Sequence, residues 1–218
     1  MKINNYFIIL FGSVALLHLY STFLSNTDIH FVTKPLLIPL LGLGLLLGEI
    51  NYPKSIIGAL VFSWIGDILL LFDDYFIPGL ISFLTAHIFY ILAFVKLSNK
   101  ESNKVSFIFI TTLFVIAYLT TFLTLIKSSL GDMMIPVFVY GLVISVMLWV
   151  ALNRKNKTSS KSFYLTAIGA CLFVLSDSLI AWNMFHSIIL YADFLIMLTY
   201  LSAQVMIVSG LISSPKSS

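Results

Sequence analysis

Two aspartates lie inside long apolar segments of this sequence. Asp67 falls in ALVFSWIGDILLLF and Asp177 in AIGACLFVLSDSLIAW, whereas the other charged residues fall in short polar stretches or near the chain ends. A carboxylate at the centre of a membrane helix costs about 2.5–3.5 kcal/mol on insertion scales, and such residues are usually functional. Each aspartate follows a small residue, Gly66 or Ser176. The two aspartates are therefore the first candidates for acid–base chemistry.

Six further polar residues in or beside the apolar segments are predicted to support this pair. They are Lys34, His87, Tyr140, Asn183, Tyr200 and Gln204. Counting at about 1.5 Å of rise per residue places Lys34 at the outer face and the other five in the outer half of the membrane. A simpler interpretation exists for each. The aspartates, the histidine and the amides can join helices by hydrogen bonds, the tyrosines can pack, and the lysine can anchor its helix.

Composition sets the class of protein. Hydrophobic residues make up 60% of the 218 residues, charged residues 10%, and the mean hydropathy is +1.05. Soluble domains carry about 25% charged residues, so an integral membrane protein is predicted. The net charge of +3 does not predict nucleic-acid binding, because the basic residues are scattered over loops. Cys171 is the one cysteine, which excludes an internal disulfide.

Eight apolar runs predict the fold. They are 6–25, 33–47, 55–72, 76–97, 105–126, 135–152, 163–185 and 192–213. Most approach the ~20 residues that a membrane-spanning helix needs. The second run is short and contains Pro35 and Pro39, so it is expected to be tilted, irregular or packed inside the bundle. The prediction is an all-α polytopic membrane helical bundle of about eight transmembrane helices, forming a single domain over residues 1–218.

The distribution of basic residues predicts the orientation. Ten of the twelve would lie on one side, namely Lys2, Lys54, Lys96, Lys100, Lys104, Arg154, Lys155, Lys157, Lys161 and Lys216. Only Lys34 and Lys127 would lie on the other side. Cytoplasmic loops carry the excess of lysine and arginine. Both the N and C termini are therefore predicted to be cytoplasmic, in a multi-pass protein of the bacterial cytoplasmic (inner) membrane.

The two halves of the chain are weakly alike. Asp67 and Asp177 are four spans apart, and the next span in each half carries a small-small-polar triplet, at 85–87 and at 202–204. Parallel repeats are known among membrane proteins. Either a duplication that relates spans one to four to spans five to eight, or chance similarity between apolar helices, accounts for the likeness.

Several kinds of site are not predicted. The sequence has no H-E-x-x-H motif, no cysteine cluster and no group of histidines, so no metal site is expected. It also has no G-x-S-x-G nucleophile elbow and no glycine-rich phosphate loop. Acid–base chemistry by carboxylates is what remains.

An ordered set of short motifs carries a resemblance to a known family. The motifs are Lys34-Pro35, G-D at 66–67, A-H-x-x-Y at 86–90, G-A-x-x-F-x-x-S-D at 169–177 and Y-x-x-A-Q at 200–204. In this order they resemble the YhhN-like lysoplasmalogenase family, over about residues 30 to 210. Each motif is weak alone, but the set is fairly specific.

The resemblance implies an activity and roles for residues. It implies hydrolysis of the vinyl ether bond of lysoplasmalogens (alkenyl-glycerophosphocholine or -ethanolamine), which releases a fatty aldehyde and a glycerophospho-head group. It also implies that Asp67 and Asp177 are the catalytic acidic residues, with no cofactor and with an alkenyl lysophospholipid as the partner. His87, Tyr200 and Gln204 would orient the carboxyls or the water. Which aspartate is the acid stays open at this stage.

Two other functions fit paired intramembrane carboxylates. A proton-coupled transporter or channel uses them as proton relays. An intramembrane aspartyl protease also places two aspartates on separate spans, but this chain lacks the Pro-Ala-Leu element that such proteases carry beside the second aspartate.

Overall fold

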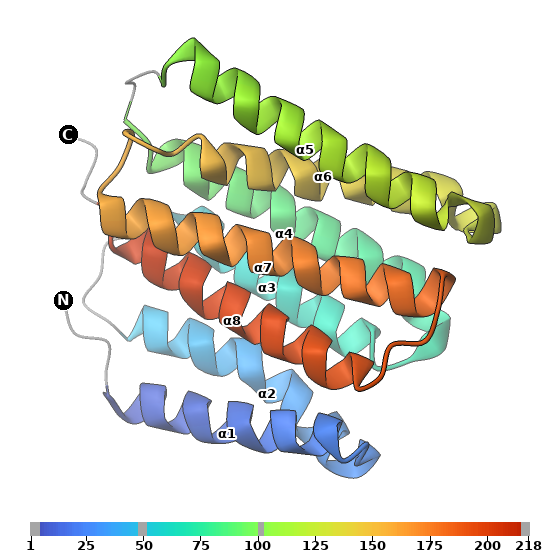
Figure 1. Cartoon of the computed structure of the whole chain (residues 1–218). Helices are drawn as coiled ribbons and strands as arrows, with labels where there is room; N and C mark the ends of the chain where they lie inside the picture. The colour runs from blue at the N-terminus through green and yellow to red at the C-terminus, as the bar shows by residue number, and fades with distance from the viewer. Residues whose placement is uncertain (1–4, 48–51, 100–102, 215–218) are drawn as a thin grey trace.

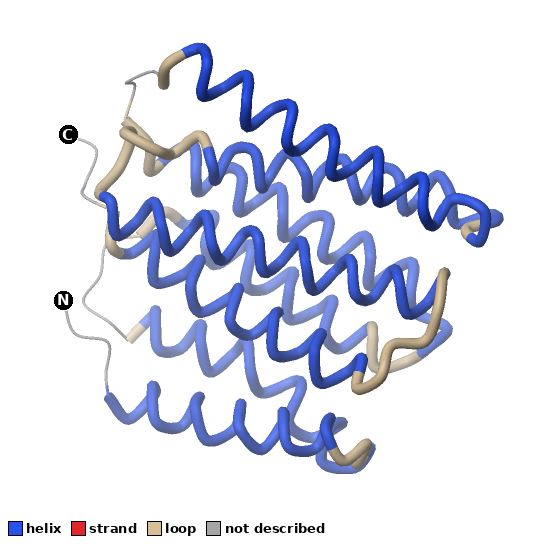
Figure 2. The backbone as a smooth tube through the Cα atoms, viewed as in Figure 1, coloured by secondary structure: helices blue, strands red, loops and turns tan. Residues whose placement is uncertain are grey.

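The protein is built from α-helices joined by short connections. The computed structural model describes residues 5–47, 52–99 and 103–214, and these ranges contain no β-strand (Figure 2). The helices within them are α1 (Asn5–Phe23), α2 (Thr27–Leu46), α3 (Lys54–Leu69), α4 (Phe76–Lys96), α5 (Val105–Ile126), α6 (Met134–Leu152), α7 (Ser160–Phe185) and α8 (Ala192–Ile212). The predicted all-α class is confirmed.

Seven of these helices are long and apolar enough to cross a membrane, as expected for an integral multi-pass protein. The exception is α3, which has 16 residues. At about 1.5 Å per residue it rises ~24 Å, less than the ~30 Å of hydrocarbon in a bilayer. The sequence predicted a third span as far as Phe72. Instead the helix ends at Leu69, and residues 70–72 turn toward the start of α4.

The helices close into a ring. Neighbours pack in the order α1, α2, α3, α4, α6, α7, α8 and back to α1, whereas α5 lies outside and packs mainly on α6 (Figure 1). Few side chains of α5 are buried. Polar groups that face the inside of such a ring are screened from lipid by the surrounding helices, which is where polar groups in membrane proteins are tolerated.

The two ends of the ring differ in charge. α1 begins and α8 ends at the same end, as Figure 1 shows. We call this the basic end, because Lys54, Arg154 and Lys161 lie there. Lys34 and Lys127 lie toward the opposite end, which we call the outer end. Lys2, Lys100 and Lys216 lie outside the described residues, and the described basic residues are divided between the two ends as the sequence predicts.

The start of α2 differs from the prediction. The sequence indicated a short span that Lys34-Pro35 opens, but the helix begins at Thr27, with the Asn26 side chain accepting a hydrogen bond from Ile29 N at 3.0 Å. Asparagine is a favoured N-cap residue. The first turn of the helix contains polar residues, so a prediction based on runs of apolar residues places its start too late. Lys34 therefore lies two turns inside the helix.

Two prolines are accommodated within α2. Proline has no N–H, so Pro39 leaves the carbonyl of Pro35 without its helical donor. Trp64 on α3 supplies a replacement, since its Nε1 donates to Pro35 O at 2.8 Å. Neighbouring helices commonly satisfy backbone groups freed by proline in membranes. This bond also ties α2 to α3 within four residues of Asp67.

Arg154 joins three segments at the basic end. Its side chain is only 1% exposed and donates to Leu97 O at 3.3 Å, Thr166 Oγ1 at 2.9 Å and Ser162 Oγ at 3.2 Å. Burial lowers the pKa of this guanidinium to about 10, so it stays protonated at neutral pH. The bonds connect the loop after α6 to the end of α4 and the start of α7, and a cation is favoured at a helix C-terminus.

The packing of α7 against α8 depends on glycine. A Cβ at Gly169 would lie 2.8 Å from Ile207 Cγ1, 3.0 Å from Ile207 N and 3.1 Å from Ala203 O. The last two are backbone atoms and cannot move away without shifting α8. Small residues let membrane helices approach in this way. The approach brings Tyr200 and Gln204 of α8 to the inside of the ring.

We therefore expect Gly169→Ala to destabilise the protein by about 1–3 kcal/mol, the usual range for overpacking a close contact. The measurement is thermal unfolding in detergent. Gly12→Ala on α1 is the matched control, because its Cβ would meet nothing within 4 Å. Equal melting temperatures for the two variants would contradict the packing described.

Candidate active site

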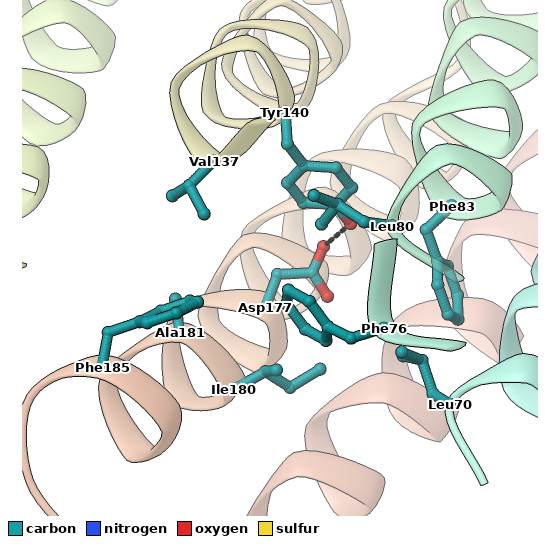
Figure 3. A pocket seen from close by; sticks show the side chains of 10 residues that line it. All are labelled: Leu70, Phe76, Leu80, Phe83, Val137, Tyr140, Asp177, Ile180, Ala181 and Phe185. Carbon is teal, nitrogen blue, oxygen red and sulfur yellow. Dashed lines mark hydrogen bonds between the residues drawn. The ribbon is translucent and has the colours of Figure 1, made fainter. Parts of the chain in front are cut away.

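Asp177 is held by donors from two other helices. Its Oδ2 accepts a hydrogen bond from Tyr140 OH on α6 and lies 3.3 Å from His87 Nε2 on α4. His87 Nε2 also lies 2.9 Å from Tyr140 OH. Both groups act on the same carboxyl oxygen, as Figure 3 shows for the tyrosine. The other carboxyl oxygen of Asp177, Oδ1, forms no hydrogen bond within the described part of the chain.

His87 makes these contacts through one ring nitrogen. Nδ1 is buried and has no hydrogen-bond partner among residues 5–47, 52–99 and 103–214. The Nε2–H tautomer suits this arrangement, because it leaves an unpaired acceptor, and not an unpaired N–H, in the core. In that tautomer the imidazole donates from Nε2 toward Tyr140 and Asp177, and Tyr140 in turn donates to Asp177.

Asp67 belongs to a second polar network. Tyr200 OH on α8 donates to Asp67 Oδ2 at 2.8 Å. Gln204, one turn further along α8, donates from Nε2 to Tyr200 OH at 3.3 Å, and its Oε1 accepts from Tyr90 OH on α4. Asp67 is 2% exposed. A carboxyl this deeply buried needs such donors, because an unpaired one would lose its hydration without compensation.

Aromatic rings fill the space between the two networks. The Phe173 ring lies 4.7 Å from the His87 ring and 5.5 Å from the Tyr200 ring, measured between centroids and with edge-to-face geometry. Phe83 lies 5.9 Å from Tyr200 in the same geometry. Edge-to-face contacts are the favoured aromatic arrangement. The two carboxyls thus interact electrostatically across an apolar partition.

The small residue before each aspartate has a packing role. A Cβ on Gly66 would lie 2.6 Å from ring carbons of Phe83, so glycine lets this ring pack against α3 beside Asp67. Ser176 donates from its hydroxyl to Ile196 O on α8 at 3.1 Å. Both residues therefore set the distance between the helix that carries the aspartate and its neighbour.

Asp177, unlike Asp67, faces a cavity. Its side chain is 14% exposed and lines an apolar cavity between α4, α6 and α7, with Leu70 and Phe83 in the wall (Figure 3). The cavity volume is about 50 Å³, and a water molecule takes up about 30 Å³ in the liquid. There is room for the first atoms of an acyl or alkenyl chain, and the remainder would extend toward lipid.

The other predicted residues are placed as follows. Asn183 lies in neither network; its Oδ1 accepts from Ile189 N at 2.9 Å and orders the connection between α7 and α8. Lys34 lies in a separate polar cavity at the outer end and interacts electrostatically with Asp67. Among the described residues, no group of three or more histidine, cysteine or acidic side chains has the geometry of a metal site.

One network member was not predicted as a site residue. Tyr90 completes the chain of hydrogen bonds from Asp67 through Tyr200 and Gln204. Its spacing was a usable signal, because His87 and Tyr90 are three residues apart on α4 and so share a helix face. A tyrosine in an apolar segment is usually a packing residue, so the sequence alone does not identify Tyr90 as part of a polar network.

Comparison with known proteins identifies similar sequences. The model of the YhhN family matches residues 29–211. The chain is 34% identical to lysoplasmalogenase TMEM86B of Homo sapiens over 166 residues, which are 76% of this chain and 66% of that protein. It is 31% identical to the Sus scrofa TMEM86B lysoplasmalogenase over 82% of this chain and 74% of that protein.

A second set of relatives carries a related name. The chain is 31% identical to lysoplasmalogenase TMEM86A of Homo sapiens, over 79% of this chain and 71% of that protein. The part of the human TMEM86B relative that this chain matches is about two thirds of that protein's length. No solved structure matches the chain significantly.

The Asp67 network generates a stability prediction. Tyr200→Phe removes the hydroxyl that donates to Asp67 and accepts from Gln204, so it leaves buried polar atoms unpaired. We expect a loss of about 1–3 kcal/mol in the free energy of unfolding, measured by thermal unfolding in detergent. Tyr164→Phe is the control, because Tyr164 is exposed on α7. A Tyr200→Phe protein as stable as the control would show that the network contributes nothing.

Proposed function

This chain belongs to the YhhN family, and we propose that it hydrolyses the vinyl ether bond of lysoplasmalogens. The products would be a fatty aldehyde and a glycerophospho-head group. The observation that carries the proposal is the Asp177 carboxyl, which presents an oxygen without a hydrogen bond to an apolar cavity inside a membrane protein. The names of the TMEM86A and TMEM86B relatives support the same reaction.

The chemistry requires one acid and one base. Transfer of a proton to the β-carbon of the vinyl ether gives an oxocarbenium ion. Water adds to the adjacent carbon of this cation and gives up a proton, and the resulting hemiacetal breaks its C–O bond to the glycerol oxygen. The sum is addition of one water molecule, with no change of redox state and no cofactor. Paired carboxyl groups serve an oxocarbenium-like transition state in glycosidases as well.

The surroundings of the two carboxyls favour different roles. We assign Asp177 as the acid, because it lines the apolar cavity that would hold the alkenyl chain beside it. We assign Asp67 as the carboxylate that stabilises the cation electrostatically from behind the Phe83 and Phe173 rings. Asp177, ionised once it has protonated the substrate, takes the proton from water. Asp67 also interacts electrostatically with Lys34.

His87 and Tyr140 are positioning residues in this scheme. Both act on Asp177 Oδ2 and so direct Oδ1 toward the cavity. Tyr200 and Gln204 have the corresponding role for Asp67. A group held in place before the substrate arrives does not have to be reoriented during the reaction.

We further infer how the protein is oriented. The basic end would face the cytoplasm, in accordance with the distribution of lysine and arginine, and both termini would lie there. The membrane would be the bacterial cytoplasmic membrane. The two carboxyls, which lie toward the outer end, would then act on lipid of the outer leaflet.

Replacement of either carboxyl tests the function. For purified protein in detergent given an alkenyl lysophospholipid, we expect Asp67→Asn and Asp177→Asn each to lower kcat by about 10²–10⁴-fold, the contribution of general acid–base catalysis. Aldehyde release is the measurement. Asp132→Asn, at an exposed position of the outer end, is the control.

The substrate analogue provides a second control. A saturated alkyl ether of the same head group has no double bond to protonate and should yield no aldehyde. Full turnover by a folded Asp177→Asn protein would refute the two-carboxylate mechanism. Absence of aldehyde from wild-type protein would refute the reaction itself.

Tyr140→Phe tests the positioning role separately. A hydrogen bond between uncharged groups contributes about 0.5–1.5 kcal/mol, which corresponds to about 2- to 10-fold in rate. We expect kcat to fall by this factor with little change in KM, since the tyrosine acts through Asp177. Tyr118→Phe is the matched control, because Tyr118 OH bonds Ser178, the next residue of α7. Equal kcat values for the two variants would contradict the role.

A further inference from the structure

A second cavity, polar in character, lies at the outer end between α1, α2, α3 and α8. Its volume is about 380 Å³. The ionisable side chains in its wall are Lys34 and His30 of α2, Asp193 of α8 and Asp73, which lies between α3 and α4. Small hydroxyl and amide residues, including Ser21, Thr22 and Asn26, form the rest of the polar lining. This composition contrasts with the apolar cavity at Asp177.

Lys34 is the unusual member of this group. It is 9% exposed, yet its ammonium group forms no ion pair or hydrogen bond within the described ranges of the chain. It interacts with Asp67 and Asp193 only at longer range. The ammonium group lines the polar cavity without a partner among the described residues, so it is available to an anion there. An anion in the cavity would supply the missing partner.

The charges in the cavity are of both signs but do not pair with one another. In the structure's described residues, no ion pair within 4.0 Å joins Lys34 or His30 to Asp73 or Asp193. Opposite charges held apart in one cavity match a ligand that carries both a negative and a positive group. His30 is fixed there by the ring of His18, 4.9 Å away, which is itself held by Thr33 Oγ1 at 2.7 Å.

The position of the cavity relative to the carboxyls fits a lysophospholipid. Leu70 lines both the polar cavity and the apolar cavity at Asp177. Lys34, which lines the polar cavity, also interacts electrostatically with Asp67. In a lysoplasmalogen only the glycerol unit separates the phosphate from the vinyl ether. A phosphate at Lys34 therefore brings the vinyl ether to the boundary between the cavities.

We propose that the outer cavity binds the zwitterionic head group of the lysophospholipid, with the phosphate against Lys34 and His30 and the ammonium group against Asp193 and Asp73. The assignment rests on the proposed function for the identity of the lipid. A phosphate gains a charge-assisted hydrogen bond from a lysine. A carboxylate gains the same from a primary ammonium group.

Binding of two analogues that cannot be hydrolysed tests the proposal. One is a saturated alkyl lysophosphoethanolamine, and the other is the corresponding alkyl lysophosphatidic acid, which has the phosphate but no amine. Calorimetry in detergent gives Kd for each. We expect Lys34→Gln to weaken both at least tenfold, and Lys34→Arg to retain binding. Asp193→Asn should weaken only the ethanolamine ligand.

The controls separate the possible results. Lys127→Gln removes the other lysine of the outer end, at an exposed position, and should leave both Kd values unchanged. An unchanged Kd for folded Lys34→Gln, or equal weakening of both ligands by Asp193→Asn, would overturn the proposal. Wild-type protein that binds the analogues but releases no aldehyde from the vinyl ether would overturn the proposed reaction and leave the head-group site standing.

Discussion

The structure depends on the burial of two carboxyl groups where water cannot solvate them. Hydrocarbon offers no hydrogen bonds, so each carboxyl must find its donors on another helix of the same protein. Asp67 finds Tyr200, and Asp177 finds Tyr140 and His87. These bonds fix which helices face one another across the ring. The close packing at Gly66 and Gly169 then follows, because longer side chains there would hold the donors away.

Each carboxyl has a hydrogen-bond partner from the other half of the chain. Asp67 in the first half is bound by α8, and Asp177 in the second half is bound by α4 as well as α6. α4 and α8 are the helices that follow α3 and α7. A duplicated four-helix unit would produce such a reciprocal exchange, and we propose that duplication. The surroundings of the two carboxyls differ, since Asp67 interacts at longer range with Lys34 and Asp177 lines an apolar cavity.

The polar residues of the two networks were more predictable from the sequence than the way in which they pair. Asp67 and Asp177 were recognisable because charge inside an apolar run is rare and unfavourable, and His87, Tyr140, Tyr200 and Gln204 were recognisable by depth. The hydrogen-bond partner of each residue was not predictable, because the rotation of each helix about its axis is determined by packing with its neighbours. Asn183 was placed at a suitable depth but turns to the loop after α7. The early start of α2 was missed because an Asn26 cap and polar first turn do not register as an apolar run.

The separation between the polar outer cavity and the apolar cavity at Asp177 suits the selection of one bond in a lipid. A lysophospholipid is polar at one end and apolar at the other, and its reactive bond lies near the boundary. In this protein that boundary is the wall around Leu70, which borders a cavity with unpaired charges on one side and the Asp177 cavity on the other. A head group that occupies the first cavity limits how deeply the chain can enter the second. Positioning of this kind lets binding energy far from the reacting atoms contribute to catalysis. An equally buried carboxyl at a position further along the lipid's hydrocarbon chain would meet only saturated carbon.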